Sequence, residues 1–247
     1  MADRIELKNL TKLYGSLQAV RQLNLSVGEG EIFGFIGPNG AGKTTTIRMM
    51  GGVILPTEGE IHIDGISMSI DPVEAKKRIG FIPDRPFLYE KLTGREFLKF
   101  TADLFRVERE LFDRKSDEIL RLFSLTDRAD ELIESYSHGM KQRLIIGAAV
   151  LHEPRVIVVD EPMVGLDPAG IKLVKDLFRR LADGGTTLFL STHSLGVAED
   201  LCNRIGIIHR GSLIATGSLD ELRQMARVQA SDLEAVFLKL TEEETSS

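Results

Sequence analysis

The sequence predicts an α/β protein built on a mainly parallel sheet, with an N-terminal antiparallel β region and an inserted helical subdomain. Two observations carry this prediction. Short apolar runs of strand type alternate with helical segments in the first and last parts of the chain, which is the pattern of parallel strands joined by helices. Residues 86–152 instead carry apolar side chains at helical spacing, so they interrupt that alternation.

The N-terminal strands come first. Residues 1–30 alternate apolar and polar side chains, with Gly15 and Gly28 as punctuation, as antiparallel strands do. The next three strands are predicted at residues 32–36, 60–63 and 79–82. The second of them ends at the turn dipeptide Asp64-Gly65, and the third ends at Pro83.

The rest of the chain holds both types of element. Helices are predicted within the inserted block at residues 93–105, 111–123 and 137–151. Strands are predicted after the block at residues 156–159, 187–190 and 205–208, with a helix at 169–181. Two short helices are predicted before the polar end of the chain, at residues 219–226 and 231–240.

Composition limits the class of protein. With 247 residues, 43% of them hydrophobic, the chain can bury a sizeable core. Its formal charge of −6 argues against a chain-wide electrostatic grip on nucleic acid. The first residues lack a signal-peptide core, and the longest apolar run, Leu144 to Leu151, is too short to span a bilayer. We therefore expect a cytoplasmic protein, and the lone Cys202, which cannot form an internal disulfide, fits a reducing compartment.

The most informative segment is a glycine-rich loop between the predicted strand at 32–36 and a helix, with the spacing G-x-x-x-x-G-K-T. Glycines let backbone N–H groups approach phosphates, the lysine reaches the β- and γ-phosphates, and the threonine hydroxyl ligates Mg²⁺. An ordinary glycine-rich turn would not require this order of residues. The segment predicts a P-loop NTPase core that binds ATP or GTP. Its residues are Gly37, Pro38, Asn39, Gly40, Ala41, Gly42, Lys43 and Thr44, followed by Thr45.

Two carboxylates follow a second buried strand. Residues 156–159 are apolar, and Asp160 and Glu161 come directly after them. Open α/β sheets bind their ligands at this end of the strands. We expect Asp160 to hold Mg²⁺ through a water and Glu161 to polarise the water that attacks the γ-phosphate. The alternative, a buried strand with a solvated tip, is disfavoured by the preceding phosphate loop.

Over residues 3–220 the chain resembles the nucleotide-binding subunits of ABC transporters, because several of their motifs occur in the same order. The resemblance implies that Tyr14 stacks on adenine and that His193, at the end of a strand, contacts the γ-phosphate. A satisfied core histidine is the alternative for His193. The other matching positions are Walker A at 37–44, Walker B at 157–160, the catalytic glutamate at Glu161, and the D-loop at 165–168 with Asp167.

The segment Ser137, His138, Gly139 and Met140 resembles the signature motif of that family, usually L-S-G-G-Q, although Tyr136, His138 and Met140 replace the leucine, the first glycine and the glutamine. Physically it is a helix start, since Ser137 is a good N-cap and first-turn amides can face an anion. A serine-capped core helix explains the cap but not the accompanying motifs. In the family the anion is the γ-phosphate held by the other subunit. The His138 side chain is either a bystander or an imidazolium that helps to hold that phosphate.

One further position departs from the family. Asp84 stands where the family usually has a glutamine, after the strand at 79–82. A carboxylate can reach Mg²⁺ or its water, but it is shorter, it is charged, and it cannot donate a hydrogen bond. We expect Asp84 to be a metal residue at the hinge of the helical subdomain.

The resemblance implies an ATPase that needs ATP and Mg²⁺ and works as a homodimer, or as a heterodimer with a similar subunit, on an integral membrane permease at the inner face of the membrane. No nucleic-acid partner is expected. The divergent signature is more similar to bacterial exporters of drugs, antibiotics, ions or lipids than to nutrient importers. Two alternatives stay open: a soluble ABC-type ATPase acting on ribosomes or nucleic acid, and a nucleotide-gated scaffold, which Glu161 disfavours.

The same resemblance divides the chain. It predicts an ABC ATPase domain over residues 1–220, followed by a C-terminal helical tail at 218–247. Within the domain, the expected parts are the antiparallel region 1–30, the catalytic core at 31–85 and 153–217, and the helical signature subdomain at 86–152.

Overall fold

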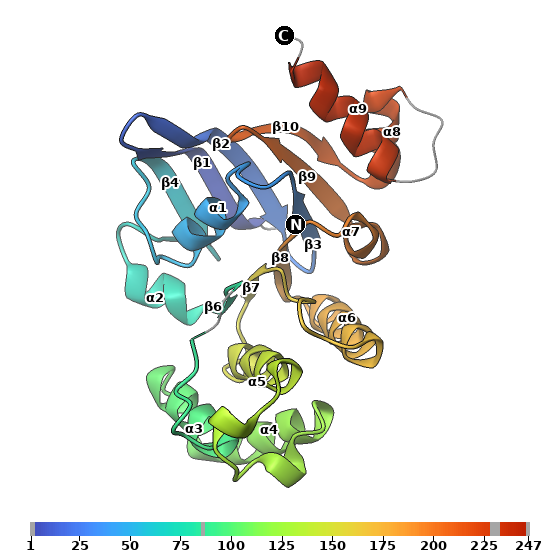
Figure 1. Cartoon of the computed structure of the whole chain (residues 1–247). Coiled ribbons are helices and arrows are strands. Elements are labelled where there is room, and N and C mark those ends of the chain that lie inside the picture. Colours follow the sequence, from blue (N-terminus) through green and yellow to red (C-terminus); the bar gives the residue numbers. More distant parts are fainter. Residues whose placement is uncertain (1–2, 85–86, 228–232, 246–247) are drawn as a thin grey trace.

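The larger of two sheets forms the centre of the molecule (Figure 1). The computed structural model describes residues 3–84, 87–227 and 233–245. Six strands lie in the order β10-β9-β3-β8-β7-β6, and all neighbours pair in parallel except β9 and β10. The predicted α/β fold with a mainly parallel sheet is therefore confirmed. The strands are β3 (Ile32–Ile36), β6 (Ile79–Ile82), β7 (Val156–Asp160), β8 (Thr187–Thr192), β9 (Arg204–His209) and β10 (Ser212–Gly217).

The smaller sheet is antiparallel, in the order β2-β1-β4-β5. Apolar side chains at alternate positions of β1, such as Ile5 and Leu7, are buried, because they face the core between the sheets. The predicted N-terminal β region is present, and its sheet also takes in β4 and β5, which lie within the segment 31–85. The strands are β1 (Asp3–Tyr14), β2 (Leu17–Gly28), β4 (Glu58–Ile63) and β5 (Ile66–Ser67).

Helices separate and cover the two sheets. Helix α1 (Lys43–Met50) lies between them and contacts β2, β7 and β8. On the other face of the large sheet, α6 (Pro168–Asp183) contacts β3 and β8, and α7 (Leu195–Leu201) contacts the same strands. The apolar side of α6 is buried, and its N-cap Asp167 accepts a hydrogen bond from the Gly170 amide. Helix α2 (Pro72–Lys77) precedes the edge strand β6.

The inserted block is helical, as predicted, and lies below the large sheet in Figure 1. Thr93 and Glu96 form a reciprocal capping box at the start of α3. Phe97, Leu98 and Phe123 are buried in one core that continues into the large sheet, so the block is not a separate globule. Its helices are α3 (Gly94–Leu104), α4 (Arg109–Leu122) and α5 (His138–Val150), with 3₁₀ turns at Thr126–Arg128 and Ile133–Ser135.

The C-terminal helices α8 (Leu219–Ala226) and α9 (Leu233–Thr245) pack on each other, and α9 also contacts α7 and β10. The second helix was predicted from residue 231, and residues 231 and 232 lie outside the described ranges, as does residue 86 at the start of the helical block. The sequence did not reveal β5, β10, α2 or α7. Of these, β5, α2 and α7 are too short to show a clear periodicity. None of the helices in the described part of the chain is long and apolar enough to cross a membrane.

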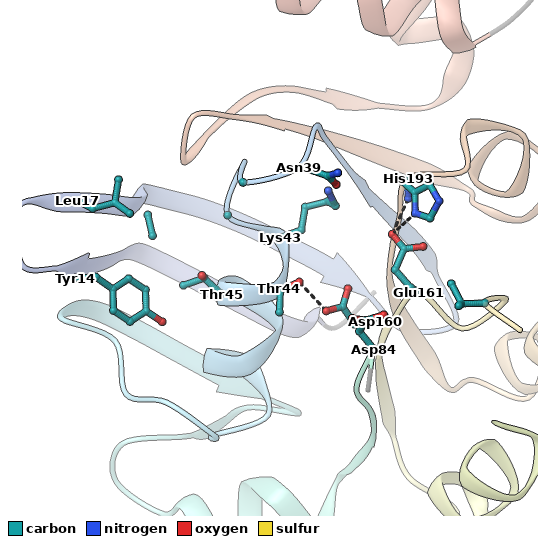
Figure 2. A pocket seen from close by; sticks show the side chains of 14 residues that line it. Tyr14, Leu17, Asn39, Lys43, Thr44, Thr45, Asp84, Asp160, Glu161 and His193 are labelled. Carbon is teal, nitrogen blue, oxygen red and sulfur yellow. Dashed lines mark hydrogen bonds and ion pairs between the residues drawn. The ribbon is translucent and has the colours of Figure 1, made fainter. Parts of the chain in front are cut away.

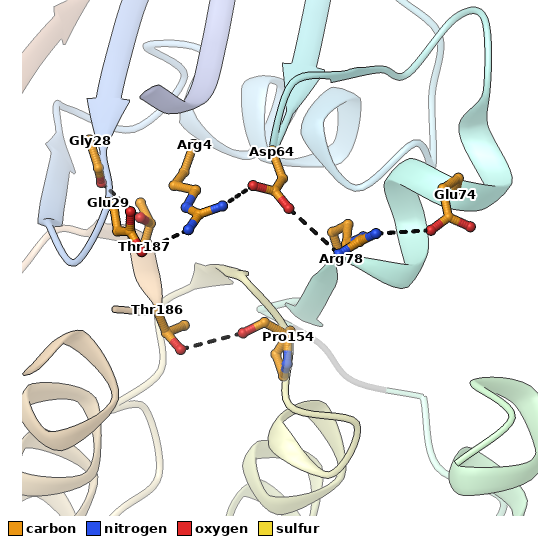
Figure 3. Close-up of polar contacts among 9 residues, drawn as sticks. All are labelled: Arg4, Gly28, Glu29, Asp64, Glu74, Arg78, Pro154, Thr186 and Thr187. Carbon is orange, nitrogen blue, oxygen red and sulfur yellow. Dashed lines mark hydrogen bonds and ion pairs between the residues drawn. The ribbon is translucent and has the colours of Figure 1, made fainter. Parts of the chain in front are cut away.

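Ion pairs join the two sheets at the amino ends of the parallel strands (Figure 3). Arg4 of β1 contacts Glu29 at 2.7 Å and also pairs with Asp64. Asp64 in turn lies 3.7 Å from Arg78, just before β6. The Thr187 hydroxyl at the start of β8 donates to the Gly28 carbonyl at 2.7 Å. These contacts fix the sheets together at the end of the molecule opposite the carboxyl ends of the strands.

Candidate active site

The glycine loop follows β3 at its carboxyl end and leads into α1. Gly40 and Gly42 have φ values of 78° and 110°, in the region that favours glycine. A Cβ at Gly42 would lie 2.5 Å from the Ala19 carbonyl oxygen, so the loop needs a residue without a side chain there. The loop therefore presents backbone N–H groups at the start of α1, where the helix dipole favours an anion.

Lys43 lies inside this loop. Its side chain is buried, and its Nζ donates hydrogen bonds to the carbonyl oxygens of Gly37 at 2.7 Å and Pro38 at 3.1 Å. Burial lowers the pKa of the Lys43 ammonium, and the nearby Glu161 and Asp160 carboxylates oppose that effect. The loop thus holds a buried cation beside two acids.

Asp160 ends β7 next to β8. The Thr44 hydroxyl donates to one Asp160 oxygen at 2.8 Å, and the Ser191 hydroxyl donates to the other. Strand register explains the second contact, because Asp160 stands opposite Ser191 in the parallel pair. Asp160 is only 3% exposed, so both carboxylate oxygens are desolvated yet hydrogen-bonded.

Glu161 turns the chain away from β7 in a left-handed conformation, with φ 52°. One of its carboxylate oxygens accepts a hydrogen bond from the His193 backbone N–H at 2.8 Å and lies 2.8 Å from His193 Nδ1. The other accepts from the Thr192 hydroxyl at 3.2 Å. Two donors at the end of β8, the Thr192 hydroxyl and the His193 backbone N–H, therefore aim this carboxylate.

These residues face one cleft of about 460 Å³ (Figure 2). Tyr14, which is 47% exposed, lines the cleft together with the loop, and His193 lines it beside Glu161. The structure thus brings together residues from five separate segments that the sequence analysis selected. Its lining residues are Tyr14, Leu17, Ala19, Asn39, Gly40, Gly42, Lys43, Thr44, Thr45, Asp84, Asp160, Glu161, Val164 and His193.

Several contributors were missed by sequence reasoning. Leu17, Ala19 and Val164 line the cleft, and Ser191 and Thr192 hold the two acids. The hydroxyl residues had a usable signal, since they end a predicted strand as the acids do. The three apolar residues had none.

The signature residues lie elsewhere. None of Ser137, His138, Gly139 and Met140 lines this cleft, and neither does Asp167. Ser137 caps α5, and its hydroxyl accepts a hydrogen bond from the Met140 N–H at 3.3 Å, as the helix-start prediction required. Within one chain, the predicted site is therefore divided between two places.

The oxygens of Thr44, Asp160 and Asp84 are of the kind that Mg²⁺ prefers. Thr44 and Asp160 already lie within hydrogen-bond distance of each other, and Asp84 lines the same cleft. Within the described residues, no three His, Cys, Asp or Glu side chains gather closely enough to hold a metal by themselves. The set suits a magnesium ion that takes its remaining oxygens from phosphates and water.

Comparison with known proteins agrees with this geometry. Residues 20–164 match the family model for ABC transporters. The chain is 42% identical to a bacitracin transport ATP-binding protein of Bacillus licheniformis, over 92% of this chain and 74% of that protein. It is 37% identical to a daunorubicin resistance ATP-binding protein of Streptomyces coeruleorubidus, over 90% of this chain and 71% of that protein.

Solved structures give the same result. An ATP-binding subunit of an ABC transporter superposes with a TM-score of 0.92 at 33% identity, over 96% of this chain and 99% of that one. A dimeric ATP-binding cassette bound to ADP and Pi after hydrolysis superposes with a TM-score of 0.77 at 30% identity, over 87% and 98% of the two chains. The chain therefore belongs to the ABC transporter family, as an ATP-binding and ATP-hydrolysing subunit.

Proposed function

We propose that the cleft binds ATP with Mg²⁺ and hydrolyses it to drive a separate permease of the exporter type. The observation that carries this proposal is the pair of acids at the end of β7, one hydrogen-bonded to Thr44 and the other to His193. In this proposal the loop amides and Lys43 hold the phosphates, and the ring of Tyr14 stacks on the base. Thr44, Asp160 and Asp84 hold Mg²⁺, which neutralises charge on the phosphates.

Hydrolysis would proceed by attack of a water on the γ-phosphorus, with ADP as the leaving group. Glu161 accepts the proton of that water, and His193 holds the Glu161 carboxylate and reaches the γ-phosphate. Because two donors from Thr192 and His193 already aim the carboxylate, little reorganisation is needed when the water arrives.

The separation of Ser137 and Gly139 from the cleft supports a dimer. A second copy, or a similar subunit, would close over the cleft and present its own signature helix start to the γ-phosphate. Each chain has both Glu161 and a capped signature helix, so a homodimer would have two competent sites. The dimeric neighbour bound to ADP and Pi supports this arrangement.

A groove beside the helical block is the proposed docking site for the permease. It has a volume of about 210 Å³ and lies where α3 and α5 meet the end of β6. Phe87 lines it and is 78% exposed, and Tyr89 packs edge-on against both Phe87 and Phe100. Such an exposed aromatic cluster is typical of interaction surfaces. Pro83 also lines the groove, so a docked helix would press next to Asp84.

In this proposal the helical block at 86–152 is the coupling part of the ATPase domain, and residues 218–247 are a C-terminal tail. The permease would hold the subunit at the cytoplasmic face of the membrane. The relatives named for bacitracin transport and daunorubicin resistance support an exporter. They also disfavour the ribosome or nucleic acid as the partner.

The test is the Glu161→Gln variant, with Thr192→Val as a control that removes one donor to Glu161 but keeps the acid. We expect Glu161→Gln to bind ATP and to elute as an ATP-bound dimer, while phosphate release falls by at least about 100-fold. Thr192→Val should lose far less activity. Unchanged phosphate release in Glu161→Gln would show that the general base is misassigned, and an ATP-bound monomer would contradict the dimer.

A further inference from the structure

One of the signature positions that depart from the family, His138, has a contact inside its own chain. The His138 ring lies against Gly165, in the loop that follows Glu161. A Cβ at Gly165 would overlap the ring, coming within 2.5 Å of its Nε2 atom, so the imidazole occupies the space where a side chain would otherwise be. Gly165 has φ 79°, in the region that favours glycine.

Two further contacts join the same two segments. The buried Gln142 side chain donates to the Pro162 carbonyl at 3.3 Å, one residue after Glu161. Arg143 pairs with Asp167 at 2.7 Å, and Asp167 also caps α6. The first turns of α5 are therefore attached to residues 162–167 along their length.

We propose that His138 is a positioning residue that couples the two ATP sites of the dimer. The inference rests on the proposed function, in which the start of α5 contacts the ATP of the opposite site. The loop held by His138 begins directly after Glu161, which acts on the chain's own ATP. A displacement of α5 by the ATP of the opposite site is thus passed to Glu161 through the His138 ring packed on Gly165. Because coupling between binding sites is reciprocal, the chain's own ATP also affects how α5 meets the opposite ATP.

The contact explains why the side chain is a ring and why it departs from glycine. A glycine at position 138 leaves the Gly165 face uncovered, whereas a planar ring fills the space above a residue without a Cβ. A Cβ at Gly139 would also make a tight contact, 3.2 Å from the Gly165 carbonyl oxygen, so a small residue fits best there. In this assignment the ring acts by packing, not by holding the γ-phosphate.

The experiment measures ATP hydrolysis by the full chain against ATP concentration, for His138→Gly, His138→Phe, Gly165→Ala and the double variant His138→Gly/Gly165→Ala. We expect His138→Gly to lower the Hill coefficient toward one and the turnover by about two- to tenfold. His138→Phe keeps a flat ring and should keep the cooperativity. Lys141→Ala is the matched control. Lys141 lies on the same helix as His138, and its substitution removes an ion pair with Glu90 without touching Gly165.

The double variant separates packing from phosphate contact. Two changes to one contact do not add, so we expect it to be no worse than Gly165→Ala alone. Three results would each overturn the inference. The first is a double variant in which the losses of turnover of the two single variants multiply. The others are a His138→Phe variant as impaired as His138→Gly, and an unchanged Hill coefficient in His138→Gly. Wild-type hydrolysis without cooperativity would overturn the role of His138 but agree with the proposed ATPase function. A wild-type chain that hydrolyses no ATP would instead contradict the proposed function.

Discussion

His152 gives a prediction whose size follows from the structure. It lies after α5, where its ring stacks on Phe105 with centroids 3.7 Å apart and an angle of 14° between the rings. Its Nε2 lies 3.1 Å from the Ile79 carbonyl oxygen, so the neutral ring donates to β6 through this nitrogen. Burial lowers the pKa of His152 from its ordinary value of 6.5 to about 4, and the hydrogen bond to Ile79 opposes only part of that effect.

The sign of the pH effect follows from proton binding. Between pH 6.5 and 4 the unfolded chain binds a proton at His152 and the folded chain does not, so the free energy of unfolding falls as the pH falls through this window. Each unit of pKa difference corresponds to about 1.4 kcal/mol, which gives a loss of up to about 3 kcal/mol by pH 4. Above pH 7 the residue is neutral in both states and contributes no pH dependence.

The assay is urea unfolding of the wild type and of His152→Gln at a series of pH values. Glutamine retains an N–H donor for Ile79 but has no proton to gain in this range. We expect the stability difference between the two proteins to change by about 3 kcal/mol between pH 7 and pH 4. A difference that stays constant with pH would refute the buried neutral state of His152.

Three other outcomes are expected. Lys43→Ala should weaken ATP binding by about tenfold or more, because it removes the only cation of the loop at residues 37–44, all of which the structure describes. Titration with a fluorescent nucleotide measures this, and an unchanged affinity would contradict the role of Lys43 in holding phosphate. Asp84→Ala should raise the Mg²⁺ concentration needed for half-maximal phosphate release, while Asp84→Gln, with the residue usual in the family, should raise it less. Cys202 is half-buried, and desolvation raises the pKa of its thiol to about 12. It should therefore react with a thiol reagent much more slowly in the native chain than after unfolding, and equal rates would contradict the raised pKa.

Much of the fold was visible in the sequence because the decisive signals are local. Alternation in β1 and β2, the capping of α5 by Ser137 and the apolar runs at β3 and β7 each depend on residues adjacent in the chain. The short elements were less visible. Helix α2 had one usable signal, since Asp71 and Pro72 are a good N-cap and first helical residue, but six residues are too few for a periodic pattern.

In the candidate site, too, local patterns were visible in the sequence and contacts between distant segments were not. The order of residues in the glycine loop and the two acids after β7 predicted a phosphate site, because the chemistry needs those residue types at that spacing. The roles of Ser191 and Thr192 appeared only when β8 was placed beside β7, which brings together positions 31 residues apart. Strand order is decided by burial over the whole sheet, so no short segment contains it.

The sequence by itself thus determined that this chain has a phosphate loop, two acids and a capped signature helix, since each is a pattern of near neighbours. Only the tertiary structure decided that Tyr14 and His193 line one cleft, that Ser137 stays out of it, and that His138 lies on Gly165. These arrangements join segments far apart in the chain. Their pairing depends on how the sheets and helices together exclude water, which no local pattern encodes.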